Sequence, residues 1–258
     1  MGRKSKVRAL CLLMVSFCFL FSQLAFAQLT PLSENGVTMG HVHLIVKDPE
    51  SYKKLLIDTL GVEVAYAGKL ELLKLPGIII LLTKGTPTET GEPTADHFAL
   101  LVRDLAAIQK KLAAANIQVS QDSIAAFPEG VRIEFLEDKK LAVPIAFHHF
   151  HIYTSDVDAI RNWYNRNFGI KFPAAANFPG GEMRFTATST PRVPTKGHPF
   201  DHISFEVKDL REFCKKLQVQ GIKLDMDIID APQIGLKVTF VTDPVGTRIE
   251  LTEGLAGK

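Results

Sequence analysis

Four segments of the chain share one spacing, in which a histidine lies seven residues before an aspartate. The pairs are His41 and Asp48, His97 and Asp104, His149 and Asp156, and His202 and Asp209. Around each histidine, alternation of apolar and polar residues predicts a strand, and the aspartate is typical of a helix start. A strand–helix unit of roughly 50 residues cannot bury its own sheet face, so the four units must pack together.

Longer stretches of the units also match one another. The segment from Asp96 overlays the segment from Asp201 at a shift of 105 residues, and the segment from His41 overlays that from His149 at a shift of 108. The second match places Gly61, the expected helix stop, on Gly169. No flexible linker separates the halves, because apolar residues run directly into the strand around Phe147. We expect modules 1 and 2 to form one unit, and modules 3 and 4 another.

The amino terminus has the pattern of a secretory signal peptide. A basic start precedes an apolar run from Ala9 to Phe26, and Ala25-Phe26-Ala27 has the small residues of a cleavage site. We expect residues 1–27 to be removed and the protein to be secreted or periplasmic, not bound to a membrane after cleavage.

Cleavage changes both charge and cysteine content. It removes four basic residues and leaves 26 basic against 28 acidic residues, without a lysine or arginine run that could follow a phosphate backbone. We therefore expect no nucleic-acid binding. Only Cys214 follows residue 27, which excludes a disulfide framework.

An acid on the last predicted strand completes a ligand set. Asp243-Pro244 and Gly246 predict a turn, and Glu250 alternates with Ile249 and Leu251 on the strand that follows. Two strand histidines and one glutamate are the donor set that holds a divalent metal while leaving positions open for a bidentate oxygen ligand. Iron, manganese, nickel, cobalt and zinc all suit these donors.

The four modules and the ending Asp243-Pro244-x-Gly246-x-x-Ile249-Glu250-Leu251 resemble the vicinal oxygen chelate superfamily. This superfamily includes glyoxalase I, bleomycin and fosfomycin resistance proteins, methylmalonyl-CoA epimerase and extradiol dioxygenases. The resemblance covers about residues 40–254. It implies an α+β fold in which four βαβββ modules form two cup-shaped mixed β-sheets with flanking helices. We expect an N-terminal glyoxalase-like domain over residues 38–146 and a C-terminal one over residues 147–254.

Carried onto this chain, the resemblance implies metal ligands at His149, His202 and Glu250. A fourth ligand position falls within residues 181–188, where the only acid, Glu182, lies too early to be assigned. Alignment of Asp138 with Asp243 places Ile145 where Glu250 stands, so we expect the N-terminal half to lack its carboxylate. If module 1 instead paired with module 4, the ligands would be His41, His202 and Glu250.

Several other polar residues could have either a functional or a purely structural role. His151 shares a face with His149 and could be a ligand, a proton shuttle or a buried strand histidine, whereas His148 faces away. His198, Arg192 and Lys196 could reach a substrate or could be solvated loop residues.

Three classes of function fit these residues. The first is a metal-dependent enzyme of lyase or isomerase type, which we favour. The second is an extradiol-like dioxygenase, and the third a metal-free small-molecule binding protein. The dioxygenases resemble one another in a tyrosine ten residues before the metal glutamate, where this chain has Phe240, and residues 203–248 contain no histidine. We expect a small-molecule substrate and a monomer or homodimer, with no catalytic residue assigned.

Overall fold

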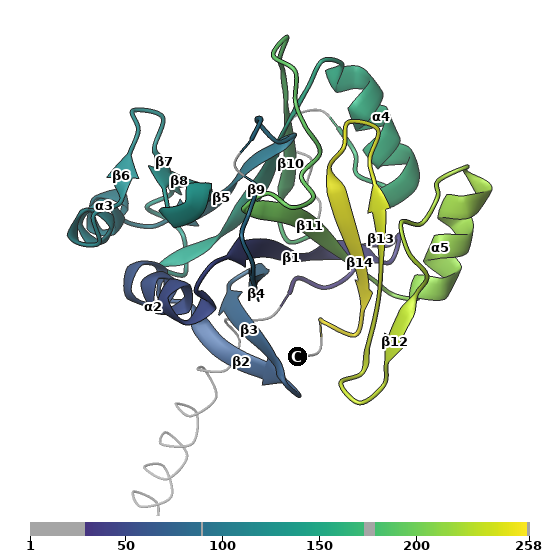
Figure 1. Ribbon diagram of the computed structural model, residues 1–258, viewed down its shortest axis with the longest axis horizontal. Helices are drawn as coiled ribbons and strands as arrows, with labels where there is room; N and C mark the ends of the chain where they lie inside the picture. The colour runs from purple at the N-terminus through teal and green to yellow at the C-terminus, as the bar shows by residue number, and fades with distance from the viewer. Residues whose placement is uncertain (1–28, 89, 173–178, 257–258) are drawn as a thin grey trace, which may run out of the picture.

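The computed structural model describes residues 29–88, 90–172 and 179–256 (Figure 1). The expected signal peptide, residues 1–27, lies outside the described residues. Among the helices of the described part of the chain, none has both the length and the apolar character needed to cross a membrane.

Each of the four expected modules opens with a strand followed by a helix. The first module consists of β1 (Val37–Val46), α2 (Pro49–Leu60), β2 (Glu63–Ala67), β3 (Leu70–Leu75) and β4 (Ile78–Lys84). The second consists of β5 (Ala95–Val102), α3 (Leu105–Ala114), β6 (Gln118–Val119), β7 (Ile124–Ala126), the short 3₁₀ helix η1 (Pro128–Gly130) and β8 (Arg132–Glu137). The third contains β9 (Ile145–Thr154), α4 (Val157–Phe168) and, within the described residues, one further strand, β10 (Glu182–Ala187). The fourth consists of β11 (Phe200–Val207), α5 (Leu210–Val219), β12 (Ile229–Ala231), β13 (Leu236–Thr242) and β14 (Arg248–Glu253).

The helices begin at the four aspartates that were predicted to start them. The side chains of Asp48, Asp104, Asp156 and Asp209 each accept a hydrogen bond from the backbone N–H three residues further on. Each cap satisfies one of the N–H groups that the first turn of a helix leaves without a partner. The repeated aspartate is therefore explained by helix capping.

The strands form two sheets, each built from modules that come from both halves of the chain. The first sheet has eight strands in the order β12-β13-β14-β11-β1-β4-β3-β2 and joins modules 1 and 4. The second has six strands in the order β10-β9-β5-β8-β7-β6 and joins modules 2 and 3. Figure 1 shows α2 and α3 on one side of the molecule and α4 and α5 on the other, with β1, β11 and β14 between them.

This arrangement differs from the expected pairing of neighbouring modules. The strand β1 pairs antiparallel with β11, and β5 pairs antiparallel with β9. The repeat spacing is compatible with either pairing, because strand partners are chosen by packing between residues far apart in the chain. The boundary expected between residues 146 and 147 therefore separates two halves that share both sheets.

A close approach of backbones helps to join the first sheet. A Cβ atom added to Gly40 of β1 would lie 2.6 Å from the Ser204 Oγ and 3.2 Å from the Ser204 carbonyl oxygen. Glycine lets β1 and β11 lie this near each other. The register of the pair also shifts between Met39 and Val42, a stretch that includes His41.

Candidate metal centres

The opening strands place their histidines on one face and their core residues on the other. Side chains alternate across a strand. In β1, Val42 and Leu44 belong to the main apolar core, so His41 and His43 point to the opposite face. The same alternation places the histidines of β5, β9 and β11 on the face opposite the main apolar core.

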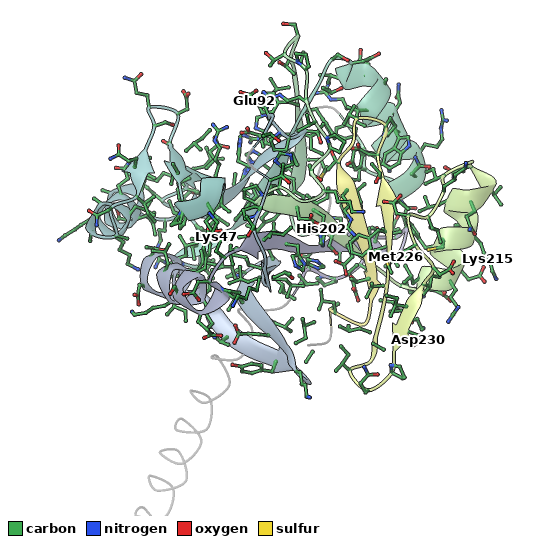
Figure 2. The ribbon with its side chains drawn as sticks, in the orientation of Figure 1. Lys47, Glu92, His202, Lys215, Met226 and Asp230 are labelled. Carbon is green, nitrogen blue, oxygen red and sulfur yellow. The ribbon has the colours of Figure 1, made fainter. Side chains whose placement is uncertain are left out.

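The first sheet brings four ligand-type residues together, which we call the first cluster: His41, His43, His202 and Glu250. The register pairs His43 of β1 with His202 of β11, and β14 lies beside β11 with Glu250 opposite Ser204. The Glu250 Oε2 accepts hydrogen bonds from the Nε2 of His202 at 2.7 Å and of His41 at 3.1 Å. Figure 2 shows His202 near the centre of the molecule.

The second sheet builds an equivalent group, the second cluster: His97, Glu134, His149 and His151. The Glu134 Oε2 lies 3.3 Å from the Nε2 of His149 and 3.5 Å from the Nε2 of His97. His151 Nδ1 is 3.1 Å from His97 Nε2. In each cluster the four ligand atoms lie within 4.8 Å of one another.

An aspartate fixes one histidine ring in each cluster. The Nδ1 of His97 hydrogen-bonds to Asp96 at 2.8 Å, and the Nδ1 of His202 makes a short hydrogen bond to Asp201. Such a contact orients the ring and leaves Nε2 to face a metal. An arginine binds each of these two aspartates. Arg132 contacts Asp96 at 2.6 Å and Arg248 contacts Asp201 at 2.8 Å.

A pair of threonines occupies matching positions beside the remaining histidines. The Nε2 of His43 lies 2.6 Å from Thr83 Oγ1, and the Nε2 of His151 lies 2.7 Å from Thr186 Oγ1. The two clusters therefore agree in their ligand-type residues and also in the residues that contact them.

The residues fit a divalent metal. Imidazole and carboxylate donors suit zinc and the neighbouring transition metals. Three buried ring nitrogens, His41 Nδ1, His43 Nδ1 and His149 Nε2, have no hydrogen-bond partner among the described residues. Buried polar atoms are nearly always satisfied, so their lack of a partner favours a missing ligand in these clusters.

In each cluster, a carboxylate raises the pKa of the histidine that also contacts an aspartate. Burial acts to lower the pKa of His202, but hydrogen bonds with Asp201 and Glu250 outweigh it and raise that pKa. The pKa of His97 is raised against burial in the same way, by Asp96 and Glu134. Burial acts to raise the pKa of Glu250, but His41 and His202 lower it. Each carboxylate is thus held in its anionic form, which is the form that binds metal.

The ligand set expected from the sequence is divided between the clusters. His202 and Glu250 lie together, with His41 and His43, whereas His149 belongs to the second cluster. The cause is the pairing of β1 with β11, which was the alternative arrangement weighed from the sequence. His151 also lies in the second cluster, and Glu182 contacts Arg184 at 3.3 Å and is not among the clustered residues.

The N-terminal half carries the carboxylate that it was expected to lack. Glu134 lies on β8, which pairs with β5 as β14 pairs with β11. The sequence contains the signal: Arg132-Ile133-Glu134 repeats Arg248-Ile249-Glu250 at a shift of 116 residues. Alignment on Asp138 placed Ile145 there instead, because Asp138 follows β8 whereas Asp243 precedes β14, and the true counterpart of Asp243 is Phe127.

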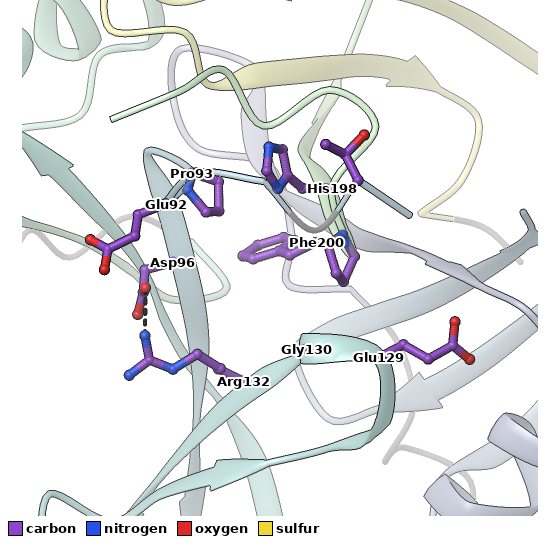
Figure 3. A pocket seen from close by; sticks show the side chains of 11 residues that line it. Glu92, Pro93, Asp96, Glu129, Gly130, Arg132, His198 and Phe200 are labelled. Atoms are coloured by element: carbon purple, nitrogen blue, oxygen red, sulfur yellow. Dashed lines mark hydrogen bonds and ion pairs between the residues drawn. The ribbon is translucent and has the colours of Figure 1, made fainter. Parts of the chain in front are cut away.

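A pocket of about 390 Å³ lies beside the aspartate and the arginine that contact each other next to the second cluster (Figure 3). Asp96 and Arg132 line one side of it, and Glu129 and Gly130 of η1 line another. His198, which was considered as a substrate contact, is buried and also lines this pocket. Burial lowers the pKa of His198, so its ring is neutral at pH 7.

Sequence and structure comparisons agree with this geometry. The sequence model of the Glyoxalase/Bleomycin resistance protein/Dioxygenase superfamily matches residues 146–251. Residues 146–251 therefore belong to this superfamily, as the resemblance implied. None of the curated proteins matches the chain.

Solved structures show the fold over the larger part of the chain. Glyoxalase I from Zea mays has a TM-score of 0.66 at 13% identity, covering 86% of this chain and 94% of its own. A putative dioxygenase from Bacillus subtilis has a TM-score of 0.61 at 13% identity, covering 88% of this chain and 86% of its own. The predicted α+β fold is confirmed by these similarities.

Proposed function

We propose that the protein is an exported metal-dependent enzyme that acts on a small molecule, with a divalent metal in each cluster. The observation that carries this proposal is the convergence of three histidines and one glutamate, twice, with an aspartate behind one histidine each time. Such a constellation has no evident structural purpose. Apolar side chains would fill the same space without the cost of burying charge.

The residues have distinct roles in this proposal. His41, His202 and Glu250 would hold the metal of the first cluster, and His149, His97 and Glu134 that of the second. A bound divalent metal would supply Lewis-acid activation of two neighbouring oxygen atoms of a substrate. The remaining histidines, His43 and His151, are available as a further ligand or as a base.

The remaining histidines are uncharged. Burial, together with the nearby His202 and His41, lowers the pKa of His43 to about 3. Burial and the nearby His97 lower the pKa of His151 to about 4. Both rings are therefore neutral at pH 7, which is the form of imidazole that binds a metal. We favour a reaction of lyase or isomerase type, in which a proton moves next to an activated carbonyl.

The two alternative functions are a dioxygenase and a metal-free binding protein, and the measurements below distinguish them. In a dioxygenase the residue ten before the metal glutamate would be a tyrosine, but Phe240 packs edge-on against His202 with ring centroids 5.1 Å apart and has no hydroxyl. A metal-free binding protein has no use for the two ligand sets.

Metal titration of the purified protein tests the proposal. We expect two equivalents of Mn, Fe, Ni, Co or Zn per chain, with Glu250→Gln and Glu134→Gln each removing one equivalent. A protein that binds none of these metals would overturn the proposal. Oxygen uptake with catechols, measured beside lyase and isomerase assays, then separates the dioxygenase from the favoured class.

A further inference from the structure

The two clusters contain the same types of ligand residue, but the side chains on the neighbouring strand, which form the wall of each cluster, differ. The strand β4 lies parallel to β1 with Ile79 beside His41 and Leu81 beside His43. The strand β10 lies parallel to β9 in the equivalent place, with Glu182 beside His149 and Arg184 beside His151. Neighbouring side chains in a parallel sheet share a face, so these residues lie on the same faces as the two clusters.

The wall of the first cluster is apolar and closed. Ile79 is 2% exposed and Leu81 is 6% exposed. They pack in a separate hydrophobic cluster with Leu72, Leu236 and Leu255. A charged group entering this wall would lose its hydration without gaining a partner.

The wall of the second cluster carries an accessible cation. The Arg184 side chain is 39% exposed, and its Nε donates to Glu182 Oε2 at 3.3 Å. Its two terminal nitrogens make no hydrogen bond or ion pair with the residues that the structure describes. A guanidinium has five donor N–H groups, so one contact through Nε leaves the paired terminal groups free for an anion.

Arg184 lies next to the second cluster. It stands beside His151 in the register of β9 and β10, and its partner Glu182 stands beside His149. The Glu134 side chain is 17% exposed, so the second cluster is not completely closed. A metal and a guanidinium would then face the same space.

We propose that the second cluster binds a small carboxylate bearing a second oxygen on the neighbouring carbon, with Arg184 as the residue that selects for the negative charge. The inference rests on the proposed metal at His97, Glu134 and His149, and it assigns a substrate class to one of the two sites. The first cluster, whose apolar wall holds Leu81 where Arg184 stands, does not bind this ligand.

Binding of oxalate to the metal-loaded protein tests the inference. In calorimetry with Mn-loaded protein, we expect one oxalate per chain. Arg184→Leu should weaken binding about 10- to 100-fold, because a charge-assisted hydrogen bond is lost. Arg184→Lys should restore part of the affinity. Arg166→Leu removes the same charge from the exposed face of α4 and should leave the affinity unchanged.

Variants of the two glutamates separate the possible failures. Oxalate binding should be lost in Glu134→Gln and kept in Glu250→Gln, and the reverse result would place the carboxylate in the first cluster and overturn the inference. Unchanged oxalate affinity in Arg184→Leu, at full metal content, would overturn the inference while leaving the proposed function intact. A chain without bound metal would overturn both.

Discussion

In each of the two clusters, an aspartate contacts one of the histidines. Asp96 and Asp201 each immediately precede the histidine that they contact, so within a strand their side chains would ordinarily point to the opposite face. Each nevertheless contacts the Nδ1 of that histidine and an arginine of the last strand of its module. They are positioning residues, because they act through the histidine and need not touch a substrate.

Replacement of these aspartates gives a matched pair of predictions. Asp201→Asn keeps a hydrogen-bond acceptor but removes the charge, so metal affinity of the first cluster should fall about 10- to 100-fold. Asp96→Asn should have the same effect on the second cluster alone. Metal titration resolves the two sites, and an equal loss at both sites in either variant would contradict the assignment.

A second prediction concerns Asp243 in the turn before β14. Burial raises the pKa of Asp243 to about 6, although hydrogen bonds from Thr247, Val245 and the Tyr164 hydroxyl oppose the rise. In the unfolded chain this pKa is about 3.9. The contribution of Asp243 to stability is therefore complete below about pH 4 and is lost as the pH rises to about 6. The loss is about 3 kcal/mol.

Urea unfolding between pH 4 and pH 7 measures this effect. Because other groups titrate in the same range, the informative quantity is the difference between the wild type and Asp243→Asn. That difference should change by up to about 3 kcal/mol across the range. A difference that is constant with pH would show that Asp243 is ionised in the folded protein throughout.

At the scale of single elements, the sequence contained most of the structure. The four aspartates predicted the helix starts because capping depends only on residues within one turn. The positions of Pro49 and Gly61 predicted the ends of α2 for the same local reason. Glu134 was also predictable from the repeated Arg-Ile-Glu, but alignment on Asp138, which follows β8, concealed it.

Capping gives a prediction for α4. The Asp156 side chain accepts a hydrogen bond from Ala159 N–H at 2.9 Å. Asp156→Ala should lower the free energy of unfolding by about 1 kcal/mol, and Asp156→Asn by less, since asparagine is also a good cap. Asp158→Ala, which removes an exposed acid from the same turn, should change it by only a few tenths of a kcal/mol. Equal effects of Asp156→Ala and Asp158→Ala in urea unfolding would exclude capping as the cause.

At the scale of the whole molecule, local patterns did not determine which modules pair. His149 was grouped with His202 because the spacing is alike in the two halves. This grouping assumed that β1 pairs with β5 and β9 with β11, whereas β1 pairs with β11 and β5 with β9. The choice depends on packing between sheets, for example of Phe98 and Phe150 against Phe200. Such contacts span large sequence separations and leave no periodic signal.

This pairing makes the halves dependent on each other. A chain cut between Lys140 and Leu141, in the loop before β9, should give two fragments that associate when co-expressed, because both sheets cross the cut. Size-exclusion chromatography should show the fragments eluting together, and neither alone should bind metal. Independent folding of the fragment after the cut, with metal bound, would contradict the pairing.

Module 1 pairs with module 4, and module 2 with module 3. The two sheets are therefore completed at different times during synthesis. The second sheet has all of its strands once residue 187 has left the ribosome. In contrast, β1 cannot pair with β11 until about 160 further residues have been made, and its histidines cannot contact Glu250 until β14, about 210 residues later, has been made. Long-range partners of this kind form slowly and leave a strand edge exposed meanwhile. The signal-peptide pattern of residues 1–27 predicts export, and delivery of the chain before folding would keep that exposed edge from pairing with other chains.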